Sequence, residues 1–229
     1  IVALDRARLE AVNAVDPMVT IATVPEFHRV DAEGMIATIK IIAYAVPEAA
    51  VAQAGQGAAG AMRVIPPSLR SATLIETRVS AETPPDKGRA AMRGRLERMG
   101  VSLAPRVVVR HREAELAEAV KAAEGDLVLI LTGSATSDPA DVAPEAVRIA
   151  GGRVERFGMP VDPGNLLFIG AHNGRPVIGL PGCARSPALN GADWVLERIL
   201  CGLKVTSADI AAMGVGGLLK EIPTRPMPR

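Results

Sequence analysis

The sequence predicts an α/β fold, namely a three-layer α/β/α sandwich around a mostly parallel, mixed sheet, plus a small N-terminal β-rich unit. The first observation is the unbroken apolar run Asp126-Leu-Val-Leu-Ile-Leu131, which is typical of a strand buried on both faces of a parallel sheet. The second is the order of elements, because strands alternate with amphipathic helices before a hairpin and a last helix. Right-handed βαβ connections make the first strands parallel, and the hairpin adds antiparallel ones.

The first 60 residues form the predicted accessory unit. Residues 1–15 are typical of a short helix or an extended lead-in. The β-branched residues 18–24 and the longer run of residues 35–46 predict two strands. The glycine-rich residues 55–60 predict a linker, although residues 49–54 before it could be helical.

The main domain is expected over residues 61–204. Its expected strands lie at 72–79, 102–110, 126–131, 152–160 and 165–170, with a further apolar strand at the start of 175–187, and its expected helices lie at 84–99, 113–123, 142–150 and 188–203. In the first of these helices, Met92, Leu96 and Met99 share one apolar face. The dipeptide Asn173-Gly174 predicts the hairpin turn, because both residues tolerate positive φ. Residues 205–229 predict a C-terminal tail, with 223–229 as an extended linker.

Two loops at strand ends are the candidate ligand sites. The strand at 126–131 leads into a loop of small polar residues and then into a helix that Asp141 can cap. The segment 175–187 is likewise an apolar strand, a Gly/Pro loop and a helix start, with Ser186 as the expected cap of that helix and Pro187 at its first position. We expect both loops to lie side by side at the carboxyl ends of their strands and to form a cleft that favours a phosphate. The alternative is that each is an ordinary βα turn.

Composition and charge limit the classes of function. Hydrophobic residues make up 48% of the chain but aromatic residues only 2%, so the core must consist of aliphatic side chains and methionine. A net charge of +1 gives no argument for binding nucleic acid or an anionic membrane, and no apolar run is long enough for a membrane span. Cys183 and Cys201, expected at two ends of one helical element, indicate neither a disulfide framework nor a zinc site, so we expect a cytoplasmic protein. The chain begins at Ile1 rather than Met, which indicates a piece of a longer protein.

The two loops resemble a known family. The segment Leu131-Thr-Gly-Ser-Ala-Thr-Ser-Asp-Pro-Ala-Asp-Val-Ala-Pro-Glu145 resembles the signature loop of the molybdopterin-binding domain of molybdenum cofactor biosynthesis, and Gly179-Leu-Pro-Gly-Cys183 resembles its second motif. The resemblance covers roughly residues 65–204. Further segments at 158–165, 181–187, 190–194 and 213–222 resemble a bacterial subfamily in which this domain precedes a cytidylyltransferase-type nucleotidyltransferase.

The resemblance implies roles for two carboxylates. The family residue that matches Asp141 lies at the active site and is implicated, with magnesium, in nucleotide transfer to molybdopterin. Asp138 could be a second oxygen ligand of the metal. The alternatives are a plain helix cap for Asp141 and a structural loop residue for Asp138.

Candidate phosphate-binding residues come from both loops. They are Thr132, Gly133, Ser134, Thr136 and Ser137 in the first loop, and Pro181, Gly182, Cys183, Arg185 and Ser186 in the second. The loop hydroxyls could instead satisfy their own backbone, and Arg185 could form a surface salt bridge. A helix N-terminus would lower the pKa of the Cys183 thiol, but with no histidine partner we do not expect a nucleophile.

Other polar residues have structural interpretations. Asp162 and Asn165 could close the pocket from the side or simply form a rigid turn. The histidines, at positions 28, 111 and 172, lack ligand spacing and are expected to be structural or solvated.

Three functions follow from the resemblance. The first is binding of molybdopterin with Mg²⁺ and ATP or CTP, followed by nucleotide transfer (nucleotidyltransferase) or molybdate insertion (molybdotransferase). The second is a non-catalytic module that presents molybdopterin to a fused nucleotidyltransferase; Ser134 and Thr136 stand where the family has glycines, which restricts the loop. The third is hydrolysis of a nucleotide pyrophosphate. Homo-oligomers are common among such relatives. The Met/Leu face of the helix expected at 84–99 would suit an interface between copies of the chain.

Overall fold

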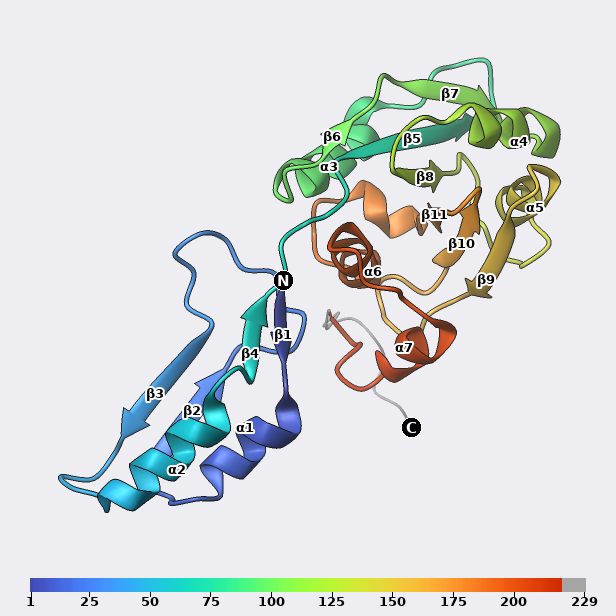
Figure 1. Cartoon of the computed structure of the whole chain (residues 1–229). Coiled ribbons are helices and arrows are strands. Elements are labelled where there is room, and N and C mark those ends of the chain that lie inside the picture. Colours follow the sequence, from blue (N-terminus) through green and yellow to red (C-terminus); the bar gives the residue numbers. More distant parts are fainter. Residues whose placement is uncertain (220–229) are drawn as a thin grey trace, which may run out of the picture. The chain divides into compact units, whose positions relative to one another are not determined.

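The computed structural model describes residues 1–219, which fold into two compact units (Figure 1). The first unit is Ile1–Pro66 and the second begins at Pro67, a few residues after the predicted boundary at residue 60. Among the described residues, no helix combines the length and hydrophobicity needed to cross a membrane.

The first unit contains two small antiparallel sheets and two helices. Strand β1 (Val2–Leu4) pairs with β4 (Met62–Val64), strand β2 (Val19–Thr23) pairs with β3 (Ala37–Ile41), and the helices are α1 (Arg6–Asn13) and α2 (Glu48–Ala58). Leu9 and Val12 of α1 pack with Val19, Ile21 and Ala54 in a core of this unit's own. The unit is therefore a mixed α and β structure rather than a β-rich one.

Two expectations for the first unit were wrong. Residues 55–58, predicted as linker, belong to α2, because the alanine-rich sequence favours a helix and Ala54 anchors it in the core. The second strand spans only Ala37–Ile41, since its partner β2 offers pairing positions only from Val19 to Thr23.

The second unit is built on one mixed sheet, as predicted. Its strands are β5 (Ser71–Arg78), β6 (Ser102–Leu103), β7 (Val107–Arg110), β8 (Leu127–Leu131), β9 (Arg153–Phe157), β10 (Phe168–His172) and β11 (Arg175–Gly179). The order is β6-β5-β8-β11-β10-β9, and β7 also pairs with β5. Strands β6, β7 and β8 run parallel to β5, and β11 runs parallel to β8, whereas β10 is antiparallel to both of its neighbours.

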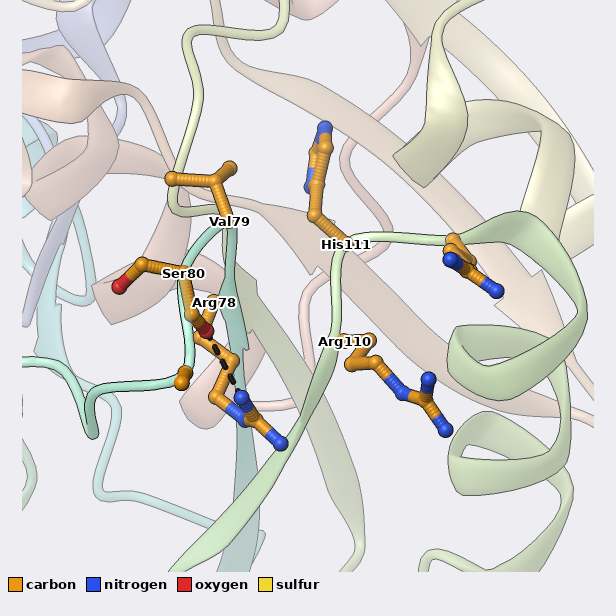
Figure 2. A pocket seen from close by; sticks show the side chains of 7 residues that line it. Arg78, Val79, Ser80, Arg110 and His111 are labelled. Atoms are coloured by element: carbon orange, nitrogen blue, oxygen red, sulfur yellow. Dashed lines mark hydrogen bonds between the residues drawn. The ribbon is translucent and has the colours of Figure 1, made fainter.

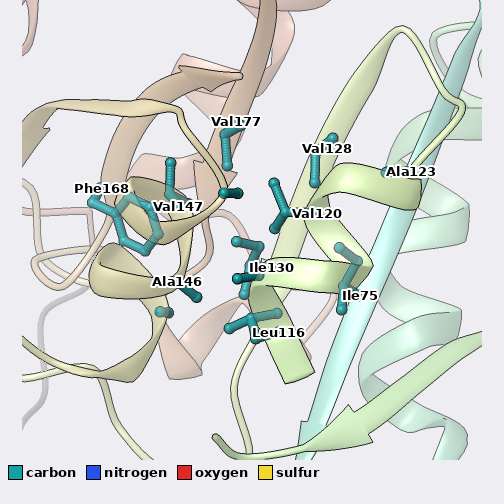
Figure 3. Packing of buried hydrophobic residues seen from close by; sticks show 13 residues of the cluster. Ile75, Leu116, Val120, Ala123, Val128, Ile130, Ala146, Val147, Phe168 and Val177 are labelled. Atoms are coloured by element: carbon teal, nitrogen blue, oxygen red, sulfur yellow. The ribbon is translucent and has the colours of Figure 1, made fainter. Parts of the chain in front are cut away.

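Helices cover both faces of this sheet (Figure 1). They are α3 (Asp86–Glu97), α4 (Glu113–Ala122), α5 (Val142–Ile149), α6 (Gly191–Leu200) and α7 (Ser207–Ala212). Figure 3 shows the core between the sheet and the helices α4 and α5, where Leu116 and Val120 lie near Ile130 and Val147 lies near Phe168. The aliphatic core that the composition predicted is therefore present.

The apolar face of α3 is not available as an interface. Met92 and Leu96 are fully buried, and Met99 is nearly so, since this face packs onto the domain's own core. The expectation that it joins copies of the chain was therefore wrong.

The helix after β11 begins later than predicted. Residues Gly182–Arg185 form a 3₁₀ turn, η1, and α6 starts only after Asn190. The Asn190 side chain accepts a hydrogen bond from Ala192 N, and Asp193 Oδ2 accepts one from Asn190 N at 2.8 Å, which is a capping box. Ser186 is therefore not the cap, and Cys183 and Cys201 lie on different elements.

The start of the predicted tail belongs to the domain. Thr206 caps α7, whose Ile210 is fully buried. The backbone of Asp162 accepts from Leu219 N and donates to Gly217 O, at 2.9 and 2.8 Å. Residues 205–219 are thus attached to the sandwich, and the predicted linker at 223–229 lies outside the described residues.

Candidate functional site

The loops after β8 and β11 lie side by side, as predicted. Their strands are parallel neighbours, and Leu180 N donates to Ile130 O at 2.8 Å. The Arg185 guanidinium reaches across and donates to the carbonyl oxygen of Thr132. No described carboxylate pairs with Arg185, so its positive charge stays unneutralised between the two loops.

Two hydroxyls of the first loop hold the loop itself together. Thr132 and Thr136 are buried, and the Thr132 hydroxyl donates to Ser134 O at 2.5 Å while lying 3.2 Å from the Thr136 hydroxyl. For these two residues, the alternative that threonines satisfy their own loop is therefore correct. The side chains of Ser134 and Ser137 are exposed.

Three consecutive backbone donors of this loop are free. Among the described residues, the N–H groups of Ser134, Ala135 and Thr136 have no hydrogen-bond acceptor. The loop is exposed apart from Thr132 and Thr136, so an anion can reach these donors from solvent. Backbone N–H groups in such a loop are common phosphate ligands.

Gly133 is fixed by a close approach of the neighbouring strand. Its N–H donates to the Thr77 hydroxyl at 2.8 Å, and a Cβ at Gly133 would lie 2.6 Å from the Thr77 carbonyl oxygen. Only glycine fits here without moving backbone. This contact joins the loop after β8 to the end of β5.

The Asp141 carboxylate faces back into the loop rather than capping α5. Its Oδ2 accepts from Ser137 N at 2.6 Å and from Asp138 N at 3.0 Å, and it makes no capping bond to the helix. Asp138 in turn accepts from Ala140 N at 2.7 Å. Both carboxylates therefore shape one turn, and within residues 1–219 no group of three or more acidic, histidine or cysteine side chains could hold a metal ion.

The second loop is shaped largely by its own turn. Pro181 precedes the turn, Gly182 is exposed, and the Ser186 hydroxyl accepts from Ala188 N at 3.3 Å. Burial raises the pKa of the half-buried Cys183 thiol, contrary to the predicted lowering, because desolvation outweighs the lowering by a backbone hydrogen bond and by the charge of Arg95. A thiol that resists ionisation is a poor nucleophile.

A buried arginine organises the rest of this loop. Arg95 of α3 pairs with Asp193 at 2.5 Å, and both side chains are almost fully buried. The same guanidinium donates to the carbonyls of Ala184, Ser186 and Ala188 at 2.9–3.0 Å. These contacts hold the irregular, bent stretch between η1 and α6 in place.

A pocket of about 460 Å³ lies at the carboxyl ends of β5 and β7 (Figure 2). Its lining residues are Arg78, Val79, Ser80, Ala81, Arg110, His111 and Arg112. Thr77 connects it to the predicted site, because the Thr77 hydroxyl contacts both Gly133 N and, at 2.9 Å, His111 Nδ1. Burial lowers the pKa of His111, which the nearby Asp141 carboxylate opposes in part, so the ring is mostly neutral at pH 7.

Comparison with known proteins gives the family. The sequence profile described as "Probable molybdopterin binding domain" matches residues 72–200, which is more than half of the 229-residue chain. The chain belongs to the molybdopterin-binding domain family. The matched region contains both loops, the pocket and Arg95, so the candidate site lies entirely within the second unit.

The comparisons with solved structures and with curated proteins give weaker evidence than the family profile. The molybdopterin biosynthesis MoeA protein from Pyrococcus horikosii shares 24% identity at a TM-score of 0.44, covering 58% of this chain and 35% of its own. The CinA protein of unknown function from Thermoplasma acidophilum shares 20% identity at a TM-score of 0.36, covering 51% of this chain and 90% of its own. The comparison with curated proteins found no match.

Sequence reasoning missed the residues of the pocket. His111 was expected to be structural or solvated, and Arg78, Arg110 and Arg112 were not considered. The rule that was applied to residues 132–137 and 181–186, that ligands lie where parallel strands end, would also have selected these residues. By contrast, Asn165 donates to Met159 O, so it serves the turn at 159–165.

Proposed function

We propose that the chain binds molybdopterin at the loops after β8 and β11 and thereby serves molybdenum cofactor biosynthesis. The observation that carries the proposal is the set of three free backbone N–H groups at Ser134, Ala135 and Thr136, next to the unpaired charge of Arg185. A terminal phosphate would accept hydrogen bonds from these donors and ion-pair with the guanidinium. The exposed hydroxyls of Ser134 and Ser137 would add further donors.

We further propose that Asp138 and Asp141 assist a Mg²⁺-bound nucleotide, ATP or CTP. Mg²⁺ in such sites takes one or two carboxylates and completes its shell with water and substrate phosphate oxygens. Asp141 Oδ1 accepts no hydrogen bond from any described residue, so this oxygen is open to a cation. When bound, the metal would neutralise charge on the phosphates, while the turn of residues 137–141 keeps both carboxylates in place.

A non-catalytic binding role has its own support. The buried contact between the Thr132 and Thr136 hydroxyls ties the loop at a position where the family motif has a glycine. A tied loop is suited to holding one ligand conformation rather than rearranging during a reaction. In that role the domain would present molybdopterin to a fused nucleotidyltransferase, and a homo-oligomer would form through a face other than that of α3.

The deciding experiment is incubation of the purified chain with molybdopterin, Mg²⁺ and either ATP or CTP, followed by mass analysis of the pterin. The test variant is Asp141→Asn, which removes the charge but keeps the shape of the turn. The matched control is Asp126→Asn at the opposite end of β8, where the carboxylate likewise accepts backbone N–H bonds, from Arg70 and Ser71.

Each result identifies one function. A nucleotidylated pterin that is lost in Asp141→Asn but retained in Asp126→Asn would establish a nucleotidyltransferase and name its nucleotide. Unchanged, tightly retained pterin in both variants would establish a binding module. Cleavage of the nucleotide pyrophosphate without pterin transfer would indicate a hydrolase, and no retention of pterin would refute the proposal.

A further inference from the structure

Exposed apolar side chains gather in and beside strand β3 of the first unit. Between residues 35 and 44, even the least exposed of the large ones, Ile41, is 52% exposed. These side chains are Met35, Ile39, Ile41, Ile42 and Tyr44. A concentration of exposed apolar surface of this kind marks a contact with another protein surface, where Tyr and Met are enriched.

The outer edge of β3 is open, whereas the outer edge of its partner β2 is closed. The Asn13 side chain donates to Ile21 O at 3.0 Å and accepts from Ile21 N at 2.8 Å, so it occupies the edge of β2. Ile21 and Ile39 are register partners, and since the backbone groups of Ile21 point away from β3, those of Ile39 point away from β2. The same alternation turns the backbone of Ala37 and Ile41 outward. An open apolar edge is a template for a further strand.

The apolar face of this two-stranded sheet is covered at β2 but not at β3. Directly opposed residues share a face, so Ile41 and Ile39 lie on the same face as Val19 and Ile21. Val19 and Ile21 are each 6% exposed and belong to the core of the first unit, whereas Ile39 is 69% exposed. A strand added at the open edge would give the two isoleucines of β3 apolar neighbours.

The sequence around β3 is complementary to itself when two copies run antiparallel. With Ile39 opposite its own copy, apolar side chains face apolar ones and polar side chains face polar ones. The opposed pairs are Ile36 with Ile42, Ala37 with Ile41, and Thr38 with Lys40. A shifted register that opposes Lys40 to its own copy would place like charges together, which is destabilising. Lys40 therefore favours the register centred on Ile39.

We propose that β3 pairs antiparallel with β3 of a second copy of this chain, so that two two-stranded sheets become one four-stranded sheet. A two-fold axis at Ile39 makes the contact isologous and closes both open edges at once. The outward N–H groups of Ala37, Ile39 and Ile41 donate to the opposed residues of the other copy, and their carbonyls accept in return. The contact lies on the first unit, so it does not depend on molybdopterin binding.

The experiment is analytical ultracentrifugation of the full chain over a range of concentrations, which measures the dissociation constant of the dimer. In Thr38→Lys, the new lysine faces Lys40 of the other copy at two symmetric places, so we expect dimerisation about fivefold weaker. Thr38→Glu places opposite charges there and should make it about fivefold stronger. Combining Thr38→Lys with Lys40→Glu should restore dimerisation.

The matched control is Val64→Lys, which adds the same charge at an exposed position of β4 in the same unit. The pairing is supported if the dimer responds in opposite directions to the two substitutions of Thr38 and is unchanged in the control. A monomer at every concentration, or a dimer that neither substitution of Thr38 affects, would overturn it.

Hydrogen exchange provides a second measurement. The amides of Ile39 and Ile41 should exchange fast in dilute solution and slowly at concentrations where the dimer forms, because pairing protects them. Slow exchange in the monomer would show that another segment of the chain covers this edge, which would overturn the pairing. Neither measurement contains a pterin, so failure here is distinct from failure of the proposed function.

Discussion

At the scale of single residues, the candidate site depends on which groups the loops leave unbonded. Thr132 and Thr136 carry hydroxyls that could bind a ligand, yet both are buried and bonded within their own loop. The free donors are instead backbone N–H groups, which a sequence does not distinguish from bonded ones. Asp141 likewise has the expected position but bonds to the preceding turn rather than to the helix.

Gly133 gives a test at this scale. In Gly133→Ala, the new Cβ would lie 2.6 Å from the Thr77 carbonyl oxygen, so either the loop or the end of β5 must move. Overpacking of this kind costs about 1–3 kcal/mol. We expect chemical denaturation to show this loss, together with weaker retention of molybdopterin.

The control for this substitution is Gly94→Ala in α3. There a Cβ meets nothing closer than the flexible end of Arg98, at 3.8 Å. Alanine favours the helix, so stability should rise by about 0.5–1 kcal/mol. If both variants lost equal stability, the close approach at Gly133 would not be the cause.

At the scale of elements, one side chain sets where a helix begins. The sequence after β11 predicts a cap at Ser186, but the carbonyls of Ala184, Ser186 and Ala188 all accept hydrogen bonds from Arg95. The chain stays non-helical, with bends at residues 186–188, until Asn190 and Asp193 form the capping box. Helix α3 therefore controls the path of the second ligand loop.

Removal of this arginine should be costly. In Arg95→Met, the Asp193 carboxylate stays buried without its partner, which typically costs about 3–5 kcal/mol. Urea unfolding measures the loss. Arg93→Met, on the exposed side of the same helix, should change stability by no more than about 0.5 kcal/mol.

A double substitution separates the charge from the packing. Arg95→Met combined with Asp193→Asn removes the uncompensated charge, so the pair should be less destabilised than the sum of the single variants. If the effects of the two single substitutions on the free energy of unfolding simply added, Arg95 would act through its packing alone.

At the scale of the whole molecule, the two units have separate cores. Leu9 and Val12 lie in the core of the first unit, whereas Val120, Ile130 and Phe168 lie in that of the second. The single tryptophan, Trp194, lies in α6 and reports on the second unit alone.

This separation predicts independent unfolding. Leu9→Ala should destabilise the first unit by about 2–5 kcal/mol, because Leu9 is buried in its core. Hydrogen exchange should then speed up across residues 1–66, while the denaturant midpoint of Trp194 fluorescence stays unchanged. A parallel shift of that midpoint would show that the units unfold together.

By itself, the sequence determined the α/β class, the mixed sheet and the neighbouring positions of the two loops, because these follow from local apolar runs, helical periodicity and the rule for strand ends. Only the tertiary structure decided the start of α6, the bonding of Asp141 and the alignment of Arg78 with Arg110. The α6 start depends on a bond from Arg95, nearly a hundred positions away, and the arginine pair on strand register. Such contacts leave no periodic pattern in the chain, so they are visible only once it has folded.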